Sequence, residues 1–259
     1  MRVRVGEPSQ EARVVFVLHN TRIPATPHAI SPDKNWATRL RSGSIRIDTV
    51  EHLLFALSIS FNTALVELDA PEIPIVDGSA LPFIDAFADS RDADARRFFH
   101  VPLPIRITEG KSTAQLVPCI DGESPCYTVQ LDYPPPICQM SFQIFPESVD
   151  FENEIAPART FALAEDVCRL QAQGLARGGT LNNALVFDDH GPLNPEGLRF
   201  SDEPARHKML DLIGDLSLLG ALPLAHIHIL RPGHALNHRI VQALANSTQS
   251  ITSDSTKIA

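Results

Sequence analysis

Three ionisable side chains recur at four-residue intervals in the segment 202–219. His207, Asp211 and Asp215 stand at positions i, i+4 and i+8. If this segment is a helix, each step drifts by only about 40° around the axis, so the three side chains share one stripe. An imidazole and carboxylates in such a stripe can hold a metal ion or exchange protons. For this helix taken alone, a solvated polar face is an equally good explanation.

A second ionisable pair, Glu51 and His52, lies inside an apolar stretch that runs from Val50 to Leu57. Burying such a pair is costly unless the groups are paired or bind a metal. For His52 alone, a hydrogen-bonded core histidine is the better explanation. Combined with His207 and Asp211, however, His52 completes a set of two imidazoles and one carboxylate. Such a set, with its fourth position open to water, is typical of catalytic zinc, and Glu51 beside it is a candidate general base.

Several other polar groups have both a functional and an ordinary explanation. His234 lies in a Gly/Pro turn, and as a general acid it would use Asp215 to hold its tautomer or keep it protonated. For this segment taken alone, an exposed loop histidine is the better explanation of His234. The segments 158–161 and 178–183 supply hydroxyls and allow close backbone approach, although turns also have this composition.

Short strands and helices must position these groups. Apolar runs and alternation predict strands over 14–18, 44–48, 63–69, 105–107 and 127–131, and the alternation of His226 and His228 predicts a strand with one polar face. Helical spacing predicts helices over 49–60, 83–87, 163–173 and 202–219. Thr49 and Asp202 are the candidate N-caps, and Gly220 the end of the last helix.

The order of these elements predicts an α+β protein in two parts. The charged stretch 90–97 separates a first part, residues 1–98, from a second part, residues 99–259. The net charge of −9 argues against nucleic-acid binding, although a local cationic patch still permits an anionic small-molecule ligand. No apolar run approaches the length of a membrane span. The four cysteines show no CxxC spacing, which favours reduced thiols and a cytoplasmic location.

A set of motifs resembles one family, the UDP-3-O-acyl-N-acetylglucosamine deacetylases, which are zinc amidohydrolases of lipid A synthesis. The motifs occur in family order from about residue 40 to 245. They are TVEHL at 49–53, APEIPIVDGSA at 70–80, ARTF at 158–161, GLARGGT at 174–180, LRF at 198–200, RHKMLD at 206–211, IGDL at 213–216 and GHALN at 233–237.

The resemblance implies a role for each matching residue. His52, His207 and Asp211 match the zinc ligands, and Glu51 matches the general base. His234, with Asp215 behind it, matches the histidine that assists the oxyanion and the leaving amine, and Thr160 matches a hydroxyl that holds the oxyanion. Phe161 and Lys208 match positions that contact the nucleotide–sugar substrate. Val167, Ala176 and Thr180 are candidate lining residues of a passage for the acyl chain.

The resemblance also implies the architecture. Two α+β domains form a layered sandwich of sheets and helices with the active site between them, and a βαβ insert at about 162–198 forms the acyl passage. Family members normally begin with a strand and a Gly-x-Gly-Leu-His-Ser-Gly-like segment. This sequence starts beyond that segment, so we expect the edge of the first domain to lack it.

The expected function is therefore zinc-dependent hydrolysis of the acetamide of UDP-3-O-(3-hydroxyacyl)-N-acetylglucosamine, giving acetate and the free 2-amino sugar nucleotide. Two alternatives stay open at this point: a non-catalytic relative that binds sugar nucleotides or lipids, and a zinc amidohydrolase of another N-acetyl compound. A complete set of ligands, base and acid favours the catalytic hypothesis.

Overall fold

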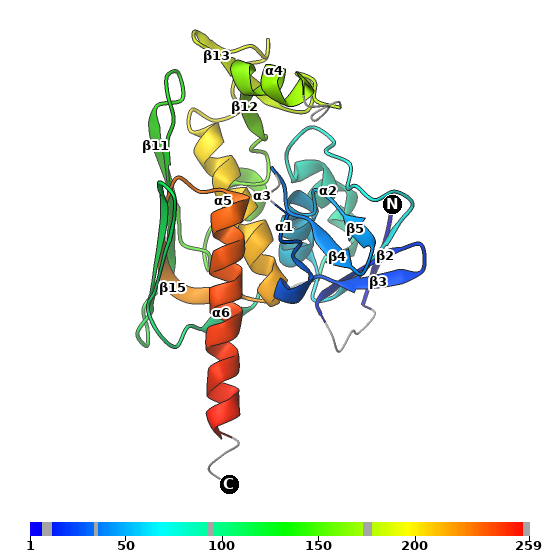
Figure 1. Cartoon of the computed structure of the whole chain (residues 1–259), viewed down its shortest axis with the longest axis vertical. Coiled ribbons are helices and arrows are strands. Elements are labelled where there is room, and N and C mark those ends of the chain that lie inside the picture. The colour runs from blue at the N-terminus through cyan, green and yellow to red at the C-terminus, as the bar shows by residue number, and fades with distance from the viewer. Residues whose placement is uncertain (7–11, 34–35, 93–95, 173–177, 256–259) are drawn as a thin grey trace.

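Two β-sheets enclose a middle layer of helices. The computed structural model describes residues 1–6, 12–33, 36–92, 96–172 and 178–255. Figure 1 shows the larger sheet on the left, α5 and α6 beside it, α1 and α2 next, and the smaller strands on the right. This arrangement confirms the predicted α+β sandwich. In the part of the chain that the structure describes, no helix is both long enough and apolar enough to cross a membrane.

The first sheet contains the earliest strands and has the order β1-β6-β2-β3. Its β2 is parallel to β6 and antiparallel to β3, while β1 pairs with β6 on the far edge. Nearly all of the side chains of β2 are buried, and its continuous apolar run is typical of a strand that is covered on both faces. The elements of this part are β1 Arg2–Val5, β2 Val14–Leu18, β3 Thr21–Pro24, η1 Pro27–Ala29, the hairpin of β4 Leu40–Ser42 and β5 Ile45–Ile47, α1 Glu51–Ser60, β6 Ala64–Leu68, α2 Leu81–Ala86 and η2 Ala88–Ser90.

The second sheet has the order β11-β10-β15-β9-β8, and β7 pairs with the first half of β15. Its inner face, which includes Tyr127, Val129 and Ile227, is buried against α5 and α6. His226 and His228 project from the outer face of β15, which confirms the predicted strand with one polar face. The elements here are β7 Phe98–His100, β8 Ile105–Glu109, β9 Ser112–Pro118, β10 Cys126–Asp132, β11 Gln139–Ile144, α3 Phe151–Glu154, α5 Glu203–Leu216, η3 Ser217–Leu219, β15 Leu222–Leu230 and α6 His234–Ser255.

A small third sheet lies at the top of the molecule in Figure 1. It is formed by β12 Phe161–Leu163, β13 Leu185–Asp188 and β14 Gly191–Pro192. β12 and β13 are parallel, and α4 Ala164–Ala172 follows β12 in the connection between them. Parallel strands need such a crossover, so this segment is a βαβ unit.

The helix starts differ in detail from the sequence prediction. Thr49 is not the N-cap of α1: it has a left-handed backbone with φ of 61°, and Val50 occupies the N-cap position. An N-cap residue normally has an extended backbone, which the left-handed Thr49 lacks. Its hydroxyl instead donates to Glu72. Asp202 does occupy the N-cap position of α5, but its carboxylate accepts from Arg206 rather than from the helix backbone.

Candidate active site

Helices α1 and α5 pack against each other and bring the predicted metal ligands together. His52 Nε2 lies 3.5 Å from Asp211 Oδ1, and His207 Nε2 lies 3.3 Å from the same oxygen. The two imidazole rings meet edge to face with centroids 4.9 Å apart. All three side chains are buried, so the solvated-face explanation for the α5 stripe is wrong.

The donor set fits a divalent metal ion. His207 Nδ1 donates to the Ala158 carbonyl at 3.0 Å, which leaves the lone pair of Nε2 directed at the centre. Asp211 Oδ1 is buried and has no hydrogen-bond partner among the described residues. Ligand atoms of a tetrahedral zinc ion lie about 3.4 Å apart when the bonds are about 2.1 Å long. The distances around Asp211 Oδ1 therefore suit zinc.

The protonation states of the residues in this centre also favour metal binding. Burial lowers the pKa of His207 to about 3, so its imidazole stays neutral and available as a ligand. Burial opposes ionisation of Asp211, but the positive charges of Lys208 and His234 outweigh burial and hold the pKa of Asp211 well below its usual value. A neutral imidazole and an ionised carboxylate are the protonation states that metal binding needs.

Glu51 lies at the first position of α1, next to this centre. Its Oε2 accepts a hydrogen bond from the backbone N–H of Thr38 at 2.9 Å. Its Oε1 lies 3.7 Å from His234 Nε2. Burial raises the pKa of Glu51, which makes the carboxylate a better proton acceptor. One oxygen is thus anchored while the other faces the reaction centre.

His234 is the first residue of α6 and is buried, so the explanation as an exposed loop histidine is wrong. Its Nδ1 donates to Asp215 Oδ2 at 2.9 Å, and Asn237 donates to the same oxygen at 2.9 Å. Burial alone would lower the pKa of His234. The carboxylates of Asp215, Glu51 and Asp211 outweigh burial and raise this pKa to about 9. His234 is therefore cationic at neutral pH, with Nε2 directed at Glu51 and Asp211.

Two residues of this network were missed from the sequence. The hydroxyl of Thr38 is hydrogen-bonded to Asp215 and lies 3.1 Å from His234 Nδ1 and 2.8 Å from His238 Nε2. Thr38 belongs to no periodic segment, so no sequence signal marks it. His238, in contrast, stands four residues after His234, and this helical spacing was an available signal.

Phe161 and Lys208 lie together beside His207. The Lys208 ammonium is 5.4 Å from the Phe161 ring centroid and 2.9 Å from Asp211 Oδ2. Phe161 also makes edge contacts with Tyr133 and His207. Burial alone would lower the pKa of Lys208, but the Asp211 carboxylate outweighs burial and raises it. An aromatic ring and a fixed cation therefore border the centre.

The ARTF segment is anchored by a buried ion pair. Arg159 Nε donates to Glu203 Oε1 at 2.9 Å, and the Arg159 N–H donates to the same oxygen at 3.0 Å. The next residue, Thr160, donates its backbone N–H to the Gly78 carbonyl at 2.7 Å. Arg159 thus fixes the position of Thr160 between the two halves of the chain.

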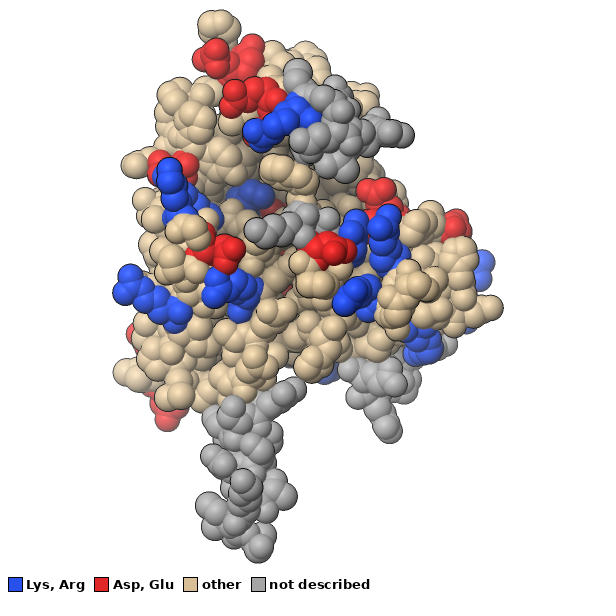
Figure 2. Space-filling view, viewed as in Figure 1, with Lys and Arg blue, Asp and Glu red and all other residues tan. Residues whose placement is uncertain are grey.

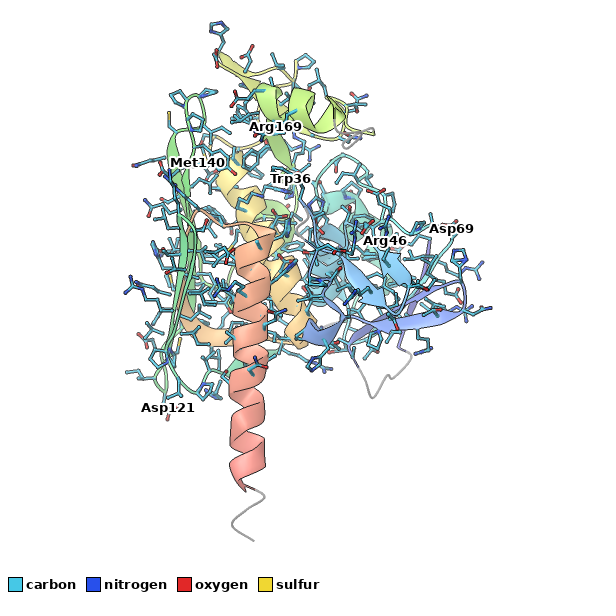
Figure 3. All side chains as sticks on the ribbon, in the orientation of Figure 1. Trp36, Arg46, Asp69, Asp121, Met140 and Arg169 are labelled. Atoms are coloured by element: carbon cyan, nitrogen blue, oxygen red, sulfur yellow. The ribbon has the colours of Figure 1, made fainter. Side chains whose placement is uncertain are left out.

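A cavity of about 940 Å³ opens beside Thr160. Its lining is largely apolar but includes charged side chains, and Figure 3 labels three of its residues: Trp36, Arg46 and Asp69. Gly178, Gly179, Asn183 and Ala184 close it from the βαβ unit. Figure 2 shows Lys and Arg side chains over several elements of this face, interspersed with acidic ones, which is how local cations coexist with the negative net charge.

The remaining predicted residues belong to the βαβ unit or lie beside it. Val167 is half-buried on α4, and Thr180 is exposed in a turn before β13. Ala176 lies outside the described residues. The lining role of these three residues stays a prediction.

Comparisons with known proteins agree with this geometry. The family model described as LpxC, UDP-3-O-acyl N-acetylglycosamine deacetylase, matches residues 2–246. A protein of Anaeromyxobacter sp. (strain Fw109-5) named UDP-3-O-acyl-N-acetylglucosamine deacetylase is 44% identical, over 81% of this chain and 70% of its own length. Proteins of the same name from Syntrophus aciditrophicus (strain SB) and Neisseria meningitidis (strain FAM18) are 40% and 39% identical. They align with 98% and 88% of this chain, and with 82% and 76% of their own lengths.

Proposed function

Because the chain belongs to the UDP-3-O-acyl-N-acetylglucosamine deacetylase family, we propose that the buried cluster of His52, His207 and Asp211 is its metal-dependent catalytic centre. The chain is a deacetylase of lipid A biosynthesis. It hydrolyses the acetamide of a UDP-3-O-acyl-N-acetylglucosamine, and the products are acetate and the free 2-amino sugar nucleotide.

One observation carries the assignment of the centre. Two imidazole nitrogens converge on Asp211 Oδ1, a buried carboxylate oxygen with no hydrogen-bond partner in the described parts of the chain. A divalent ion held there, for which zinc is the proposal, supplies Lewis-acid chemistry that polarises the amide carbonyl and makes water more acidic.

The residues around the centre divide the proton transfers between them. Glu51 Oε1 accepts a proton from the attacking water, because this oxygen faces the centre while Oε2 is held by Thr38. His234 Nε2, cationic and 3.7 Å from Asp211, stabilises the negative charge that develops on the carbonyl oxygen. His234 then donates its proton to the departing amine as the C–N bond breaks.

The positions of the neighbouring residues indicate how they support this reaction. Asp215 accepts from His234 Nδ1, which orients the ring and stabilises the cationic form that presents Nε2–H. Thr160, which Arg159 and Gly78 hold in place, is the proposed hydroxyl donor to the oxyanion. Phe161 and Lys208 border the centre and are the proposed contacts for the nucleotide–sugar.

We assign the acyl chain to the large cavity. Its apolar lining and its volume of about 940 Å³ suit a hydrocarbon chain, and its lining includes Thr160, the neighbour of Phe161, which contacts His207. The segment 162–198 contributes Gly178, Gly179, Asn183 and Ala184 to this passage. The proposal also includes a division of the chain near residue 98 and a cytoplasmic location, which the sugar-nucleotide substrate supports.

The test is acetate release from the acylated UDP-N-acetylglucosamine by purified, zinc-loaded protein. We expect Glu51→Gln to retain the metal and to lower kcat by about 10²–10⁴-fold, because only the base is removed. His207→Ala should instead lose metal and activity together. A folded, metal-loaded wild type that binds the substrate without releasing acetate would contradict the proposal and favour a non-catalytic relative.

A further inference from the structure

A second group of metal-binding side chains lies on the outer face of the large sheet. β15 separates β9 from β10, so the connection 119–125 has to cross β15 to join them. Cys119 donates its N–H to the Leu224 carbonyl at 3.1 Å at the start of this crossing. His226, two residues after Leu224, projects from the same face toward the connection.

Three different donor types converge there. Glu123 Oε1 lies 2.8 Å from His226 Nε2. The Cys119 sulfur, a Glu123 oxygen and a His226 nitrogen all lie within 4.8 Å of one another. The crossing segment holds the carboxylate in place, because Glu123 Oε2 accepts from the Ile120 N–H at 3.2 Å and the Glu123 N–H donates to the Ile120 carbonyl at 3.0 Å.

The group is open to solvent and independent of the reaction centre. The side chains of His226 and Glu123 are 36% and 41% exposed, which is enough for an ion to enter. A hollow of about 260 Å³ is lined by Cys119 and Glu123, together with His100 and Glu147. In Figure 3, Asp121 marks this segment at the left edge of the large sheet, across α5 and α6 from Arg46 and Asp69.

A disulfide does not explain the thiol. Another cysteine on this face is Cys126. It lies on β10, where it pairs with His226 of β15, whereas Cys119 follows β9 on the opposite side of β15. Both cysteines are free in the structure. Metal coordination, in contrast, suits a thiol, an imidazole and a carboxylate that already face one another.

We propose that Cys119, Glu123 and His226 form a second site for a thiophilic divalent cation, and that this cation is Zn²⁺. The set of one sulfur, one nitrogen and one oxygen donor is compatible with tetrahedral zinc, with a water molecule in the fourth position. Bound there, the ion fixes the 119–125 crossing over β15. The site differs from the catalytic centre in one testable respect: it contains a thiolate.

Titration of the full chain with Co²⁺ tests this proposal. The catalytic ligands include no cysteine, so a thiolate-to-cobalt charge-transfer band reports the second site alone. We expect two equivalents of Co²⁺ and this band in the wild type, with Zn²⁺ displacing both. Cys119→Ser should lose the band and one equivalent while retaining acetate release. Glu123→Gln should weaken Co²⁺ binding at this site about tenfold or more.

Two control variants test whether the band comes from Cys119. Cys138→Ser removes an exposed cysteine elsewhere in the chain and should leave the band unchanged. His207→Ala should remove the catalytic equivalent and leave the band, so failure of the proposed function is distinguishable from failure of this proposal. A wild type without the band, or a band that survives Cys119→Ser, would overturn the second site.

Discussion

Gly214 of α5 lies directly against the backbone of Glu51 at the start of α1. A Cβ atom built on Gly214 would lie 2.3 Å from the Glu51 carbonyl oxygen and 3.0 Å from its carbonyl carbon. Real Cβ atoms essentially never come this close to backbone, so only glycine permits this helix crossing. The same contact places Glu51, the proposed general base, beside the stripe of His207, Asp211 and Asp215. Helix packing and catalytic geometry therefore depend on one hydrogen atom in place of a side chain.

Gly214→Ala should separate α1 from α5. Overpacking of this kind destabilises a core by about 1–3 kcal/mol, and here it also moves Glu51 and His52 away from Asp211. We expect a lower melting temperature, weaker zinc binding and reduced acetate release. Gly178→Ala is the matched control for the melting temperature, because a Cβ there meets nothing within 4 Å. Equal melting temperatures for the two variants would contradict a close contact between Gly214 and Glu51.

Thr38→Val tests the hydroxyl that joins Asp215, His234 and His238. Valine keeps the shape and the backbone N–H that holds Glu51, but it leaves buried polar groups without a partner, which typically costs about 1–3 kcal/mol. We expect kcat to fall about tenfold or more, with unchanged zinc content and little change in KM. Thr38→Ser should restore most of the activity. A loss of zinc in Thr38→Val would instead indicate a purely structural role.

The sequence was sufficient to predict the helices that carry the centre, because their periodicity is local. It did not decide whether the stripe of His207, Asp211 and Asp215 is solvated or buried. That outcome depends on α1 covering α5, a contact between segments about 155 positions apart. The resemblance of the motifs, rather than the spacing, singled out the correct pairing.

Thr38 and Thr49 show why the remainder was not predictable. The role of Thr38 exists only once α5 and α6 place Asp215 and His234 around it, and no neighbour in the sequence indicates this. Thr49 has the residue type of a helix cap, but tertiary contacts impose a left-handed backbone with its hydroxyl directed at Glu72. Local propensity is a weak guide where long-range contacts fix the backbone.

Metal removal should destabilise the protein measurably. An ion that binds only the folded state stabilises it by about 2.7 kcal/mol when its free concentration is one hundred times its Kd. We expect a chelator to lower the melting temperature and zinc to restore it. The measurement belongs in the Cys119→Ser background, so that the proposed second site does not contribute. No difference between chelated and zinc-loaded protein would contradict a buried site at His52, His207 and Asp211.

Asp77 should contribute to stability at neutral pH and lose this contribution in acid. Burial opposes its ionisation, but hydrogen bonds from Ser79 and the Arg199 guanidinium outweigh burial and lower the pKa of Asp77. A carboxyl group with a lowered pKa in the folded state stabilises the fold above its unfolded pKa of about 3.9, and this stabilisation disappears as pH falls through the folded value. Urea unfolding at pH 7 and pH 3 measures it.

The matched variant for this measurement is Asp89→Asn, at an exposed position in η2. We expect Asp77→Asn to be less stable than the wild type at pH 7, with a smaller difference at pH 3. Asp89→Asn should follow the wild type at both. A difference between Asp77→Asn and the wild type that is the same at both pH values would show that the charge of Asp77 is unimportant.

Trp36→Ala tests the assignment of the acyl chain to the large cavity. Trp36 is 68% exposed and lines this cavity with Ile73 and Ile75, so a hydrocarbon chain that enters would cover its ring. Each buried methylene contributes about 0.8 kcal/mol, so contacts with the ring gain weight as the chain lengthens. We expect KM to rise about tenfold for a long-chain substrate and little for a short-chain one, with kcat unchanged. Leu103→Ala, at a side chain that is 66% exposed outside the cavity, should change neither. An equal rise in KM for both chain lengths would assign Trp36 to the sugar nucleotide instead, because only the acyl chain differs between the two substrates.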